Sequence, residues 1–389
     1  MVKRTKAKRF SFLLNGKFDY SILIITLLLL CIGLIMLLSA SAPVSFSENG
    51  NSYDYVVKQG GVALLGLAAM IVLSKIDYRI YRKLKWLIYI VFVALLFLVG
   101  FIGIGENGAR RWINLFGFSF QPSEFAKVAF IIFYASLLTD MKEKNKIRKI
   151  VPGFIYPLIF LGPIAFALLK LQNHFSSTFV IAAITCVQMF VAGSLFRYFI
   201  GAGTFVIGAF VLYLLRNMAA GEATDFRFTR IQTWLNVEAD LTGAGWQINQ
   251  SLYAIGSGGL FGLGLGNSKQ KYLYLPEPQN DFIFAVLAEE LGFIGAIAVI
   301  ILFILFIWRG IIIAIKAEDT FGSLIAIGIT TMIGLQAIVN IAVVTNTMPV
   351  TGMPLPFFSY GGSAMLANLM AVGILLSVSR NSKKNNNKG

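Results

Sequence analysis

The chain has 389 residues, of which 57% are hydrophobic and 13% are charged. An ordinary soluble domain carries about twice that charged fraction, so these values exclude a water-soluble globular fold. The net charge of +15 is divided among short segments instead of forming one basic stripe, which argues against a nucleic-acid partner. Two cysteines and one histidine also argue against a disulfide framework, a zinc site or a haem site.

Apolar blocks of roughly 20 residues recur along the chain, which is the length that crosses about 30 Å of hydrocarbon as a helix. Strands of a membrane barrel would instead alternate over about ten residues. We therefore predict an all-α fold, a polytopic bundle of about ten spans that forms a single transmembrane domain over residues 1–389. In chain order the expected spans are 19–42, 57–75, 84–104, 121–139, 151–170, 176–194, 197–215, 281–308, 319–345 and 360–379.

The first span resembles a secretory signal, because Ala40-Ser41-Ala42 follows a basic start and an apolar run. However, Pro43 lies where cleavage would occur, and the apolar run is long. We therefore interpret this segment as an uncleaved first helix.

The positions of Lys and Arg predict the orientation, because short cytoplasmic loops collect positive charge. Of the 33 basic residues, 23 lie before the first span, in every second connection, or after the last span. Both termini are therefore expected in the cytoplasm, with 1–18 as a basic N-terminal segment and 380–389 as a tail. The segment 215–280 is then one large extracytoplasmic loop.

Two parts of this long loop have a pattern of their own. Apolar residues from Phe226 to Leu235 are interspersed with Arg227 and Arg230, which is typical of an amphipathic segment at the membrane surface, although simple packing explains it equally well. The glycines in 256–266 favour tight turns or close helix packing over a nucleotide site, because no phosphate-loop ending follows them.

The fourth span carries charged residues that need an explanation, because an ionisable side chain near the bilayer centre costs about 2.5–3.5 kcal/mol. Pro122 opens the span, in the first helical turn where its missing amide does little harm. Glu124 and Lys127 are three residues apart, so they share a helix face and can pair. The pair either neutralises itself or leaves Lys127 available to an anionic substrate.

The eighth span carries carboxylates at its start and deeper along its length. Asp281 lies at the start, where an N-terminal cap worth about 1 kcal/mol would explain it. Glu289 follows eight residues later, about 12 Å deeper along a helix. Capping alone does not explain a carboxylate at that depth, although a salt bridge with Lys127 or an arginine could.

Four stretches together carry a resemblance to a known family: Gly108-Ala109-Arg110-Arg111-Trp112-Ile113, Gln121-Pro122-Ser123-Glu124 with Lys127, Leu275-Pro276-Glu277 followed by Asp281-Phe282-Ile283-Phe284-Ala285, and the Pro-rich loop that leads into Gly361-Gly362-Ser363. In this order they resemble the SEDS family (shape, elongation, division and sporulation), the membrane glycosyltransferases of bacterial cell-wall synthesis. The resemblance covers nearly the whole chain. Arg230 and the stretch from Gly245 to Gly256 are similar to the division and sporulation branch, the FtsW-like proteins.

The resemblance implies a substrate and a role for the polar residues. The substrate would be lipid II, a disaccharide-pentapeptide on a polyprenyl pyrophosphate, polymerised on the outer face of the bacterial cytoplasmic membrane. Asp281 would be the catalytic general base that takes the proton of the acceptor sugar's 4-hydroxyl. The leaving pyrophosphate would be stabilised by cationic side chains, and Trp112 would position sugar or lipid. The expected substrate-binding residues are Arg110, Arg111, Trp112, Glu124, Lys127, Arg227, Arg230 and Glu289.

The same resemblance sets the expected cofactors and partners. No nucleotide cofactor is expected, because the donor is already activated as a pyrophosphate, although a divalent cation (Mg²⁺ or Mn²⁺) could assist. The expected partners are lipid II, membrane lipid, a class B penicillin-binding protein, which is a single-pass transpeptidase, and other division proteins. The expected location is the division septum.

One stretch departs from the family pattern. The family commonly has Gln-Pro-Asp after the fifth span, and this chain has Gln172-Asn173-His174. The missing carboxylate shifts the pairing of Lys127 towards Glu124. His174 is then a neutral hydrogen-bonding partner, a pH-sensitive one, or an ordinary loop residue at a helix start.

Two other classes of function stay open from the sequence. A lipid II flippase or transporter would also need a polar-lined bundle, but we find no repeated halves with matching broken helices. A non-catalytic scaffold that recruits a transpeptidase is compatible with the altered 172–174 stretch, because lost family residues can mean lost activity.

Overall fold

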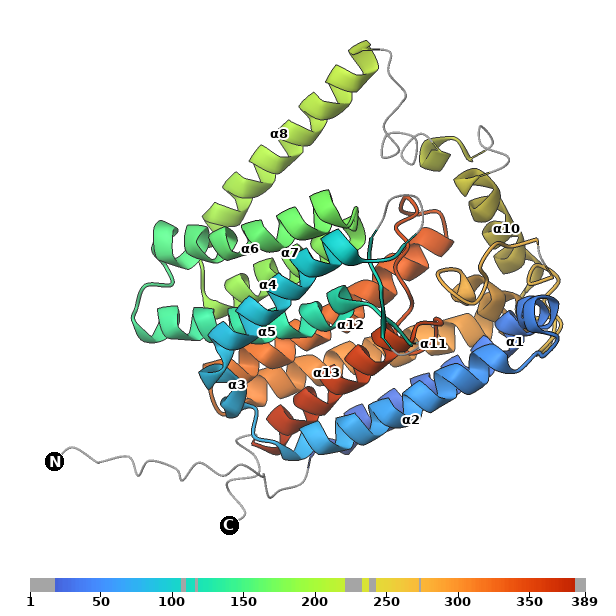
Figure 1. Cartoon of the computed structure of the whole chain (residues 1–389), viewed down its shortest axis with the longest axis horizontal. Helices are drawn as coiled ribbons and strands as arrows, with labels where there is room; N and C mark the ends of the chain where they lie inside the picture. The colour runs from blue at the N-terminus through green and yellow to red at the C-terminus, as the bar shows by residue number, and fades with distance from the viewer. Residues whose placement is uncertain are drawn as a thin grey trace.

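The computed structural model describes residues 18–105, 110–115, 118–220, 233–237, 243–272 and 274–381, and these form a bundle of long helices (Figure 1). The long helices are α1 (Tyr20–Asn49), α2 (Asp54–Lys75), α4 (Lys85–Ile102), α5 (Pro122–Glu143), α6 (Tyr156–Phe166) with the flanking π-helical turns η1 (Val151–Ile155) and η2 (Ala167–Leu171), α7 (Phe175–Ala192), α8 (Phe196–Ala220), α11 (Ile283–Lys316), α12 (Thr320–Val344) and α13 (Gly362–Arg380). Shorter elements are α3 (Arg79–Lys83), α10 (Ala244–Ser257) and a hairpin of β1 (Ile113–Leu115) and β2 (Phe118–Phe120).

Each of the ten expected spans has a helical counterpart, so the all-α prediction is confirmed. Within the described residues, eight of these helical segments are long and apolar enough to cross a membrane. The central helix α5 is not among them, because Glu124, Lys127 and other polar residues lower its hydropathy. Helix α8 is also not among them, and Figure 1 shows it directed away from the other helices.

Several boundaries differ from the prediction; helix α11, for example, continues to Lys316, whereas the expected span ended at residue 308. Helix α1 continues through Pro43 to Asn49, whereas the expected span ended at residue 42. The predicted loop 215–280 is partly helical, because α8 extends to Ala220 and α10 lies within the loop. Most of the amphipathic segment, with Arg227 and Arg230, lies outside the described residues.

The helices form a buried centre and a lipid-facing periphery. In the most apolar window of α13, 72% of the residues are buried inside the bundle, and in α12 the share is 67%, but it is only 22% in α2 and α4. Almost every residue of α5 is buried as well. Glu124 and Lys127, the charged residues within the apolar part of α5, therefore face protein rather than lipid, which is the arrangement that makes an ionisable residue tolerable in a membrane.

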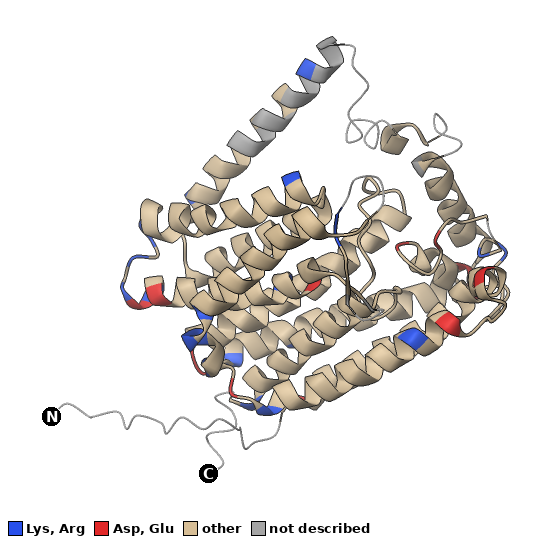
Figure 2. Ribbon diagram, in the orientation of Figure 1, with Lys and Arg blue, Asp and Glu red and all other residues tan. Residues whose placement is uncertain are grey.

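The two ends of the described chain meet on one side of the bundle. The Asp19 amide donates to the Ser379 hydroxyl at 3.0 Å, so α1 begins where α13 ends. The connection between α2 and α4, predicted on the cytoplasmic side, also meets two other segments of that side, through the ion pairs Arg79 with Glu318 (2.9 Å) and Arg82 with Asp140 (2.7 Å). Figure 2 shows most of the described charges at the helix ends. The connections that meet on this side are those that the basic residues predicted to be cytoplasmic.

The Pro-rich segment 351–361 enters the bundle instead of forming a surface turn. Leu355, Phe357 and Phe358 are all buried. The close approach of the segment requires glycine at position 33 of α1, because a Cβ there would lie 2.2 Å from the Phe357 carbonyl oxygen. Non-helical backbone is tolerated at membrane depth only where protein or a water-filled cavity surrounds it. Segment 351–361 therefore forms part of the core next to α1.

Candidate functional site

The hairpin between α4 and α5 carries Arg110 and Trp112. Trp112 is half-buried, and its carbonyl accepts a hydrogen bond of 2.8 Å from the Ile104 amide. The Arg110 guanidinium donates to the Phe101 carbonyl at 2.9 Å, and this side chain is exposed. These contacts direct Arg110 towards the end of α4.

The neighbouring Arg111 contacts a different element. Its guanidinium donates to the carbonyls of Gln172 (3.2 Å) and Asn173 (2.6 Å), in the turn between η2 and α7. Arg111 therefore lies against the stretch that departs from the family pattern.

Glu124 and Lys127 form the ion pair that their spacing predicts. The Lys127 ammonium donates to the Glu124 carboxylate at 2.8 Å, and the side chains are only 3% and 5% exposed, respectively. Both residues lie in the first turns of α5, which begins at Pro122. A buried pair of this kind costs desolvation that the Coulomb attraction only partly offsets, so it is weak evidence for a purely stabilising role.

His174 completes this group of residues. It precedes the first residue of α7, it is 8% exposed, and its Nδ1 atom has no hydrogen-bond partner among the described residues. Burial, followed by the positive charges of Arg111 and Lys127, holds the pKa of the His174 imidazole well below its usual value of 6.5. This favours the neutral His174. Arg111, Glu124, Lys127 and His174 are called the cationic cluster below.

Asp281 lies in the turn of residues 276–281 that precedes α11, and three successive carbonyls of this turn are anchored. The Gln279 carbonyl accepts from the Tyr360 amide at 2.9 Å, and the Asn280 carbonyl accepts from the Ser359 hydroxyl at 2.7 Å. The Asp281 carbonyl accepts from the side-chain amide of Asn340 on α12, also at 2.7 Å. We call residues 276–281 the Asp281 turn.

The capping explanation for Asp281 is wrong. Helix α11 begins at Ile283, and its N-cap residue is Phe282, not Asp281. The carboxylate instead faces segment 351–361, because a Cβ added at Gly352 would lie 3.4 Å from Asp281 Oδ2. Asp281 is half-buried in this position, so helix capping does not explain its placement.

Segment 351–361 connects the Asp281 turn with the cationic cluster. The Thr351 carbonyl accepts a hydrogen bond from the Ser176 hydroxyl, at the start of α7 two residues after His174. At its other end, the Ser363 hydroxyl accepts from the Gln121 amide at 2.9 Å, directly before α5. The Asp281 carboxylate and the starts of α5 and α7, which carry or adjoin the cationic cluster, therefore lie near the same segment, at the same end of the bundle.

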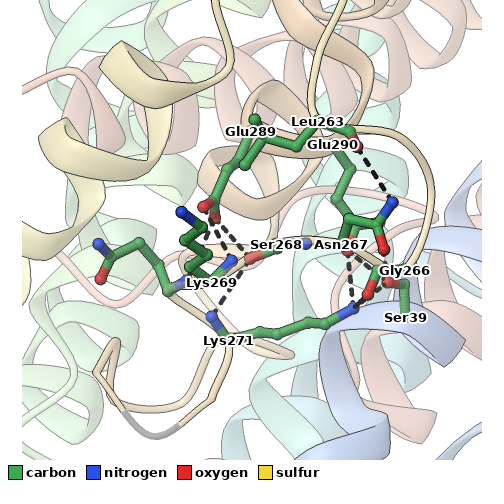
Figure 3. A network of polar contacts seen from close by, with 10 residues as sticks. Ser39, Leu263, Gly266, Asn267, Ser268, Lys269, Lys271, Glu289 and Glu290 are labelled. Carbon is green, nitrogen blue, oxygen red and sulfur yellow. Dashed lines mark hydrogen bonds and ion pairs between the residues drawn. The ribbon is translucent and has the colours of Figure 1, made fainter.

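Glu289 is not placed as predicted. Its side chain is fully buried, and its carboxylate accepts hydrogen bonds from the Ser268 hydroxyl (2.5 Å) and the Lys269 amide (2.9 Å) (Figure 3). Lys127 pairs with Glu124 instead. Glu289 therefore does not form a salt bridge with Lys127, because residues 268–269 donate hydrogen bonds to its carboxylate instead.

A cavity of about 560 Å³ lies elsewhere, between the C-terminal half of α1 and the segment 265–272. It is lined mainly by apolar and aromatic side chains, with Ser39 and Lys271 among them, and none of the predicted site residues that the structure describes lines it. Among the described residues, no three side chains of His, Cys, Asp or Glu are grouped to hold a metal ion.

Sequence reasoning missed Asn340 and Ser359, which hold the Asp281 turn. Asn340 is an amide side chain within an apolar span and is 1% exposed. The rule that polar residues at membrane depth need a reason would have identified it. Ser359 carries no comparable signal, because a serine in a Pro-rich loop is unremarkable in sequence.

Comparison with known proteins agrees with this architecture. The family described as "Cell cycle protein", FtsW/RodA/SpoVE, matches residues 20–384. The chain is thus a multi-pass helical membrane protein, and it belongs to the FtsW/RodA/SpoVE family. The resemblance to SEDS proteins is therefore confirmed.

Relatives of this chain are known in sequence and in structure. Stage V sporulation protein E of Bacillus subtilis is 44% identical, covering 94% of this chain and 98% of the relative. The probable peptidoglycan glycosyltransferase FtsW of Trichlorobacter lovleyi is 41% identical, and the match covers 94% of this chain and 93% of the relative. The rod shape determining protein RodA of Thermus thermophilus is similar in structure, with a TM-score of 0.68, 27% identity and coverage of 94% and 98%. A chain from a study of polymerization and crosslinking by a peptidoglycan synthase complex has a TM-score of 0.75, 27% identity and coverage of 93% and 98%.

Proposed function

We propose that this protein is a peptidoglycan glycosyltransferase that polymerises lipid II on the outer face of the cytoplasmic membrane. The observation that carries this proposal is the shared border of the Asp281 turn and the cationic cluster along segment 351–361. A glycosyl transfer from a pyrophosphate donor needs a base for the acceptor hydroxyl and positive charge for the leaving group. The names of the relatives point to the same reaction.

In this reaction Asp281 accepts the proton of the acceptor sugar's 4-hydroxyl as that oxygen attacks the anomeric carbon of the donor. The bond from the anomeric carbon to the pyrophosphate oxygen breaks, and the configuration at that carbon inverts. Because an ionised carboxylate is a weak base, proton transfer occurs late, as charge develops on the leaving group. Stabilisation of the polyprenyl pyrophosphate is therefore the larger contribution.

The cationic cluster provides that stabilisation. Lys127 and Arg111 carry the positive charge, and His174 stays neutral beside them, so it adds a hydrogen-bonding nitrogen and no further charge. Glu124 keeps Lys127 in place and offsets part of its charge. Arg110 and Trp112 lie at the rim on the hairpin, in contact with the end of α4. A divalent cation is proposed only as a companion of the substrate's pyrophosphate oxygens.

The proposed partner is a class B penicillin-binding protein, which would crosslink the strands that this chain polymerises. The support is the likeness to a chain from a peptidoglycan synthase complex. The curated relatives include a sporulation protein and division proteins, so the proposed location is the septum of dividing or sporulating cells.

The decisive experiment uses purified protein in liposomes with lipid II, with and without the transpeptidase partner. Wild type should produce glycan strands, and Asp281→Asn should reduce the rate at least about 100-fold, which is the usual contribution of a general base. Glu143→Gln is the matched control, because Glu143 is a carboxylate at the other end of α5, where it pairs with Arg82. Full activity of Asp281→Asn would remove Asp281 as the base.

The same preparation tests the two other classes of function. If wild type makes no strands under any partnered condition, the proposal fails. Movement of lipid II between leaflets would then identify a transporter. Binding of the transpeptidase without polymerisation or transport would identify a scaffold.

A further inference from the structure

Helix α11 is divided into two parts at Gly292. The backbone of Gly292 has φ 68° and ψ −171°, so the helical hydrogen-bonding pattern is interrupted there. The part before the break is short and runs from Ile283 to Leu291, directly after Asp281. At about 1.5 Å per residue it is a rod of roughly 13 Å. It is packed in the core, because every residue from Phe282 to Glu290 is buried.

The segment 258–272 supplies the hydrogen bonds that the broken helix lacks. The amides of Leu263 and Gly264 donate to the carbonyls of Glu289 and Glu290, both at 3.0 Å. On the other side of the break, the Phe293 amide donates to the Gly259 carbonyl at 2.9 Å, and the Ile294 amide donates to the Leu260 carbonyl at 3.2 Å. The break is thus built into the fold and paired on both sides.

This contact is too close for side chains. A Cβ at Gly292 would lie 2.2 Å from the Gly262 amide nitrogen, and a Cβ at Gly262 would lie 2.1 Å from the Glu290 carbonyl oxygen. Both glycines also have positive φ, which other residues rarely adopt. The glycine-rich stretch therefore serves close packing, as predicted, and it fixes segment 258–272 against the end of the rod.

Side chains lock the same junction (Figure 3). The Lys271 ammonium donates to the Glu290 carboxylate (2.8 Å) and to the Ser39 hydroxyl of α1 (2.9 Å), and Ser39 in turn donates to Glu290 at 2.6 Å. Glu289 is held by Ser268, as described above. We call Ser39, Ser268, Lys271, Glu289 and Glu290 the latch. It joins the end of the rod to α1 and to the loop that precedes Asp281.

The latch has no capacity left for a ligand. The third hydrogen bond of the Lys271 ammonium goes to the Gly266 carbonyl at 2.7 Å, so all three of its donors are used. Lys271 and Glu290 are 3% and 0% exposed, respectively. Although Lys271 and Ser39 border the cavity beside α1, a phosphate there would have to displace Glu290. The latch therefore acts on the position of the rod and not on a bound molecule.

We propose that the latch positions Asp281: it sets the location of the rod Ile283–Leu291, and the rod sets the location of the carboxylate at its other end. Lys271 and Glu290 are positioning residues, since neither touches the Asp281 turn. This inference rests on the proposed role of Asp281 as the base. A shift of a few tenths of an ångström at the latch is transmitted because a short buried helix moves as one body.

The test compares wild type with the charge-neutral double variant Lys271→Met plus Glu290→Gln, as full chains in liposomes with lipid II and the transpeptidase. The matched control is Arg309→Met plus Asp19→Asn, which neutralises an ion pair of α11 on the other side of the break. We expect the latch variant to lose at least tenfold in kcat, with the KM for lipid II within twofold of wild type. The control should keep its kcat within twofold.

Three outcomes of this comparison would overturn the inference. They are an unchanged kcat in a folded latch variant, an equal loss in the control, or a rise in KM without a change in kcat. Folding is checked by the unfolding temperature, which should stay within a few degrees of wild type. The variant Lys271→Arg should keep most of the kcat, because it preserves the charge.

A second measurement does not depend on activity, so it separates a failure of the inference from a failure of the proposed function. Asp281→Cys plus Gly352→Cys, in a chain with Cys31→Ala and Cys186→Ala, places two thiols where the native side chain and backbone are in contact. Gly352 has φ 71°, so a side chain there is strained, but the strain is the same in the two chains that are compared. Oxidative crosslinking should be efficient with the latch intact and fall at least threefold with Lys271→Met plus Glu290→Gln. An unchanged yield would show that the latch does not position residue 281.

Discussion

The cationic cluster and the Asp281 turn are the two halves of the candidate site, and they are held in different ways. The central ion pair of the cluster comes from residues three positions apart on one helix. The Asp281 turn has local hydrogen bonds from Asn280 to Glu277, but the carbonyls of residues 279–281 are held by Asn340, Ser359 and Tyr360 from distant parts of the chain. We infer that the positive half is robust to changes elsewhere, whereas the position of the carboxylate depends on the whole outer end of the bundle.

The largest effect is expected from breaking the ion pair of the cluster. Glu124→Gln leaves the Lys127 ammonium buried without a counter-charge, which should destabilise the fold by about 3–5 kcal/mol. The double variant Glu124→Gln plus Lys127→Met should regain most of that stability but not the polymerase activity. Thermal unfolding in detergent and strand synthesis measure the two effects. Normal polymerase activity of the folded double variant would show that the ion pair of Glu124 with Lys127 serves only stability.

The second effect concerns the long-range support of Asp281. Asn340→Leu removes hydrogen bonds to the carbonyls of Asp281 and Met353, which should cost about 1–3 kcal/mol of stability and lower kcat more than KM. Gln188→Leu is the matched control, since the Gln188 amide also bridges two buried carbonyls, but between α5 and α12. Equal losses of kcat in both variants would contradict a specific role of Asn340.

The third prediction tests the neutral state of His174. Because its pKa is lowered in the folded protein, the unfolded chain binds more protons below pH 6.5 than the folded chain does. Stability should therefore fall as the pH drops below about 6.5, by up to roughly 1.4 kcal/mol per unit from this group. His174→Gln should remove that part of the pH dependence, measured by unfolding at pH 5.5 and 7.5. An identical pH dependence in both proteins would argue against a buried neutral histidine.

The smallest effect distinguishes the two arginines. Arg111 belongs to the cationic cluster, whereas Arg110 is exposed and directed to the end of α4. Arg111→Gln should raise the KM for lipid II roughly fivefold, about 1 kcal/mol, and Arg110→Gln less than twofold. Steady-state kinetics at constant ionic strength measure both values. A larger effect of Arg110→Gln would reverse the assignment.

Much of the fold follows from the sequence, because a bilayer imposes strong constraints. Apolar blocks of spanning length predicted a helix for each of the ten spans, and the basic residues predicted which connections share a side. Within the site, the pair of Glu124 with Lys127 was predictable from its spacing on α5. These features depend on local geometry or on the thickness of the membrane.

Only the tertiary structure decided what the remaining polar residues do. Asp281 and Glu289 are both carboxylates of the eighth predicted span. Glu289 accepts a hydrogen bond from Ser268 in segment 258–272, whereas Asp281 faces segment 351–361. The difference comes from contacts between residues far apart in the chain, such as Asn340 with Asp281. No periodicity along the chain encodes such contacts, because they depend on how non-helical segments enter the bundle and satisfy buried polar groups.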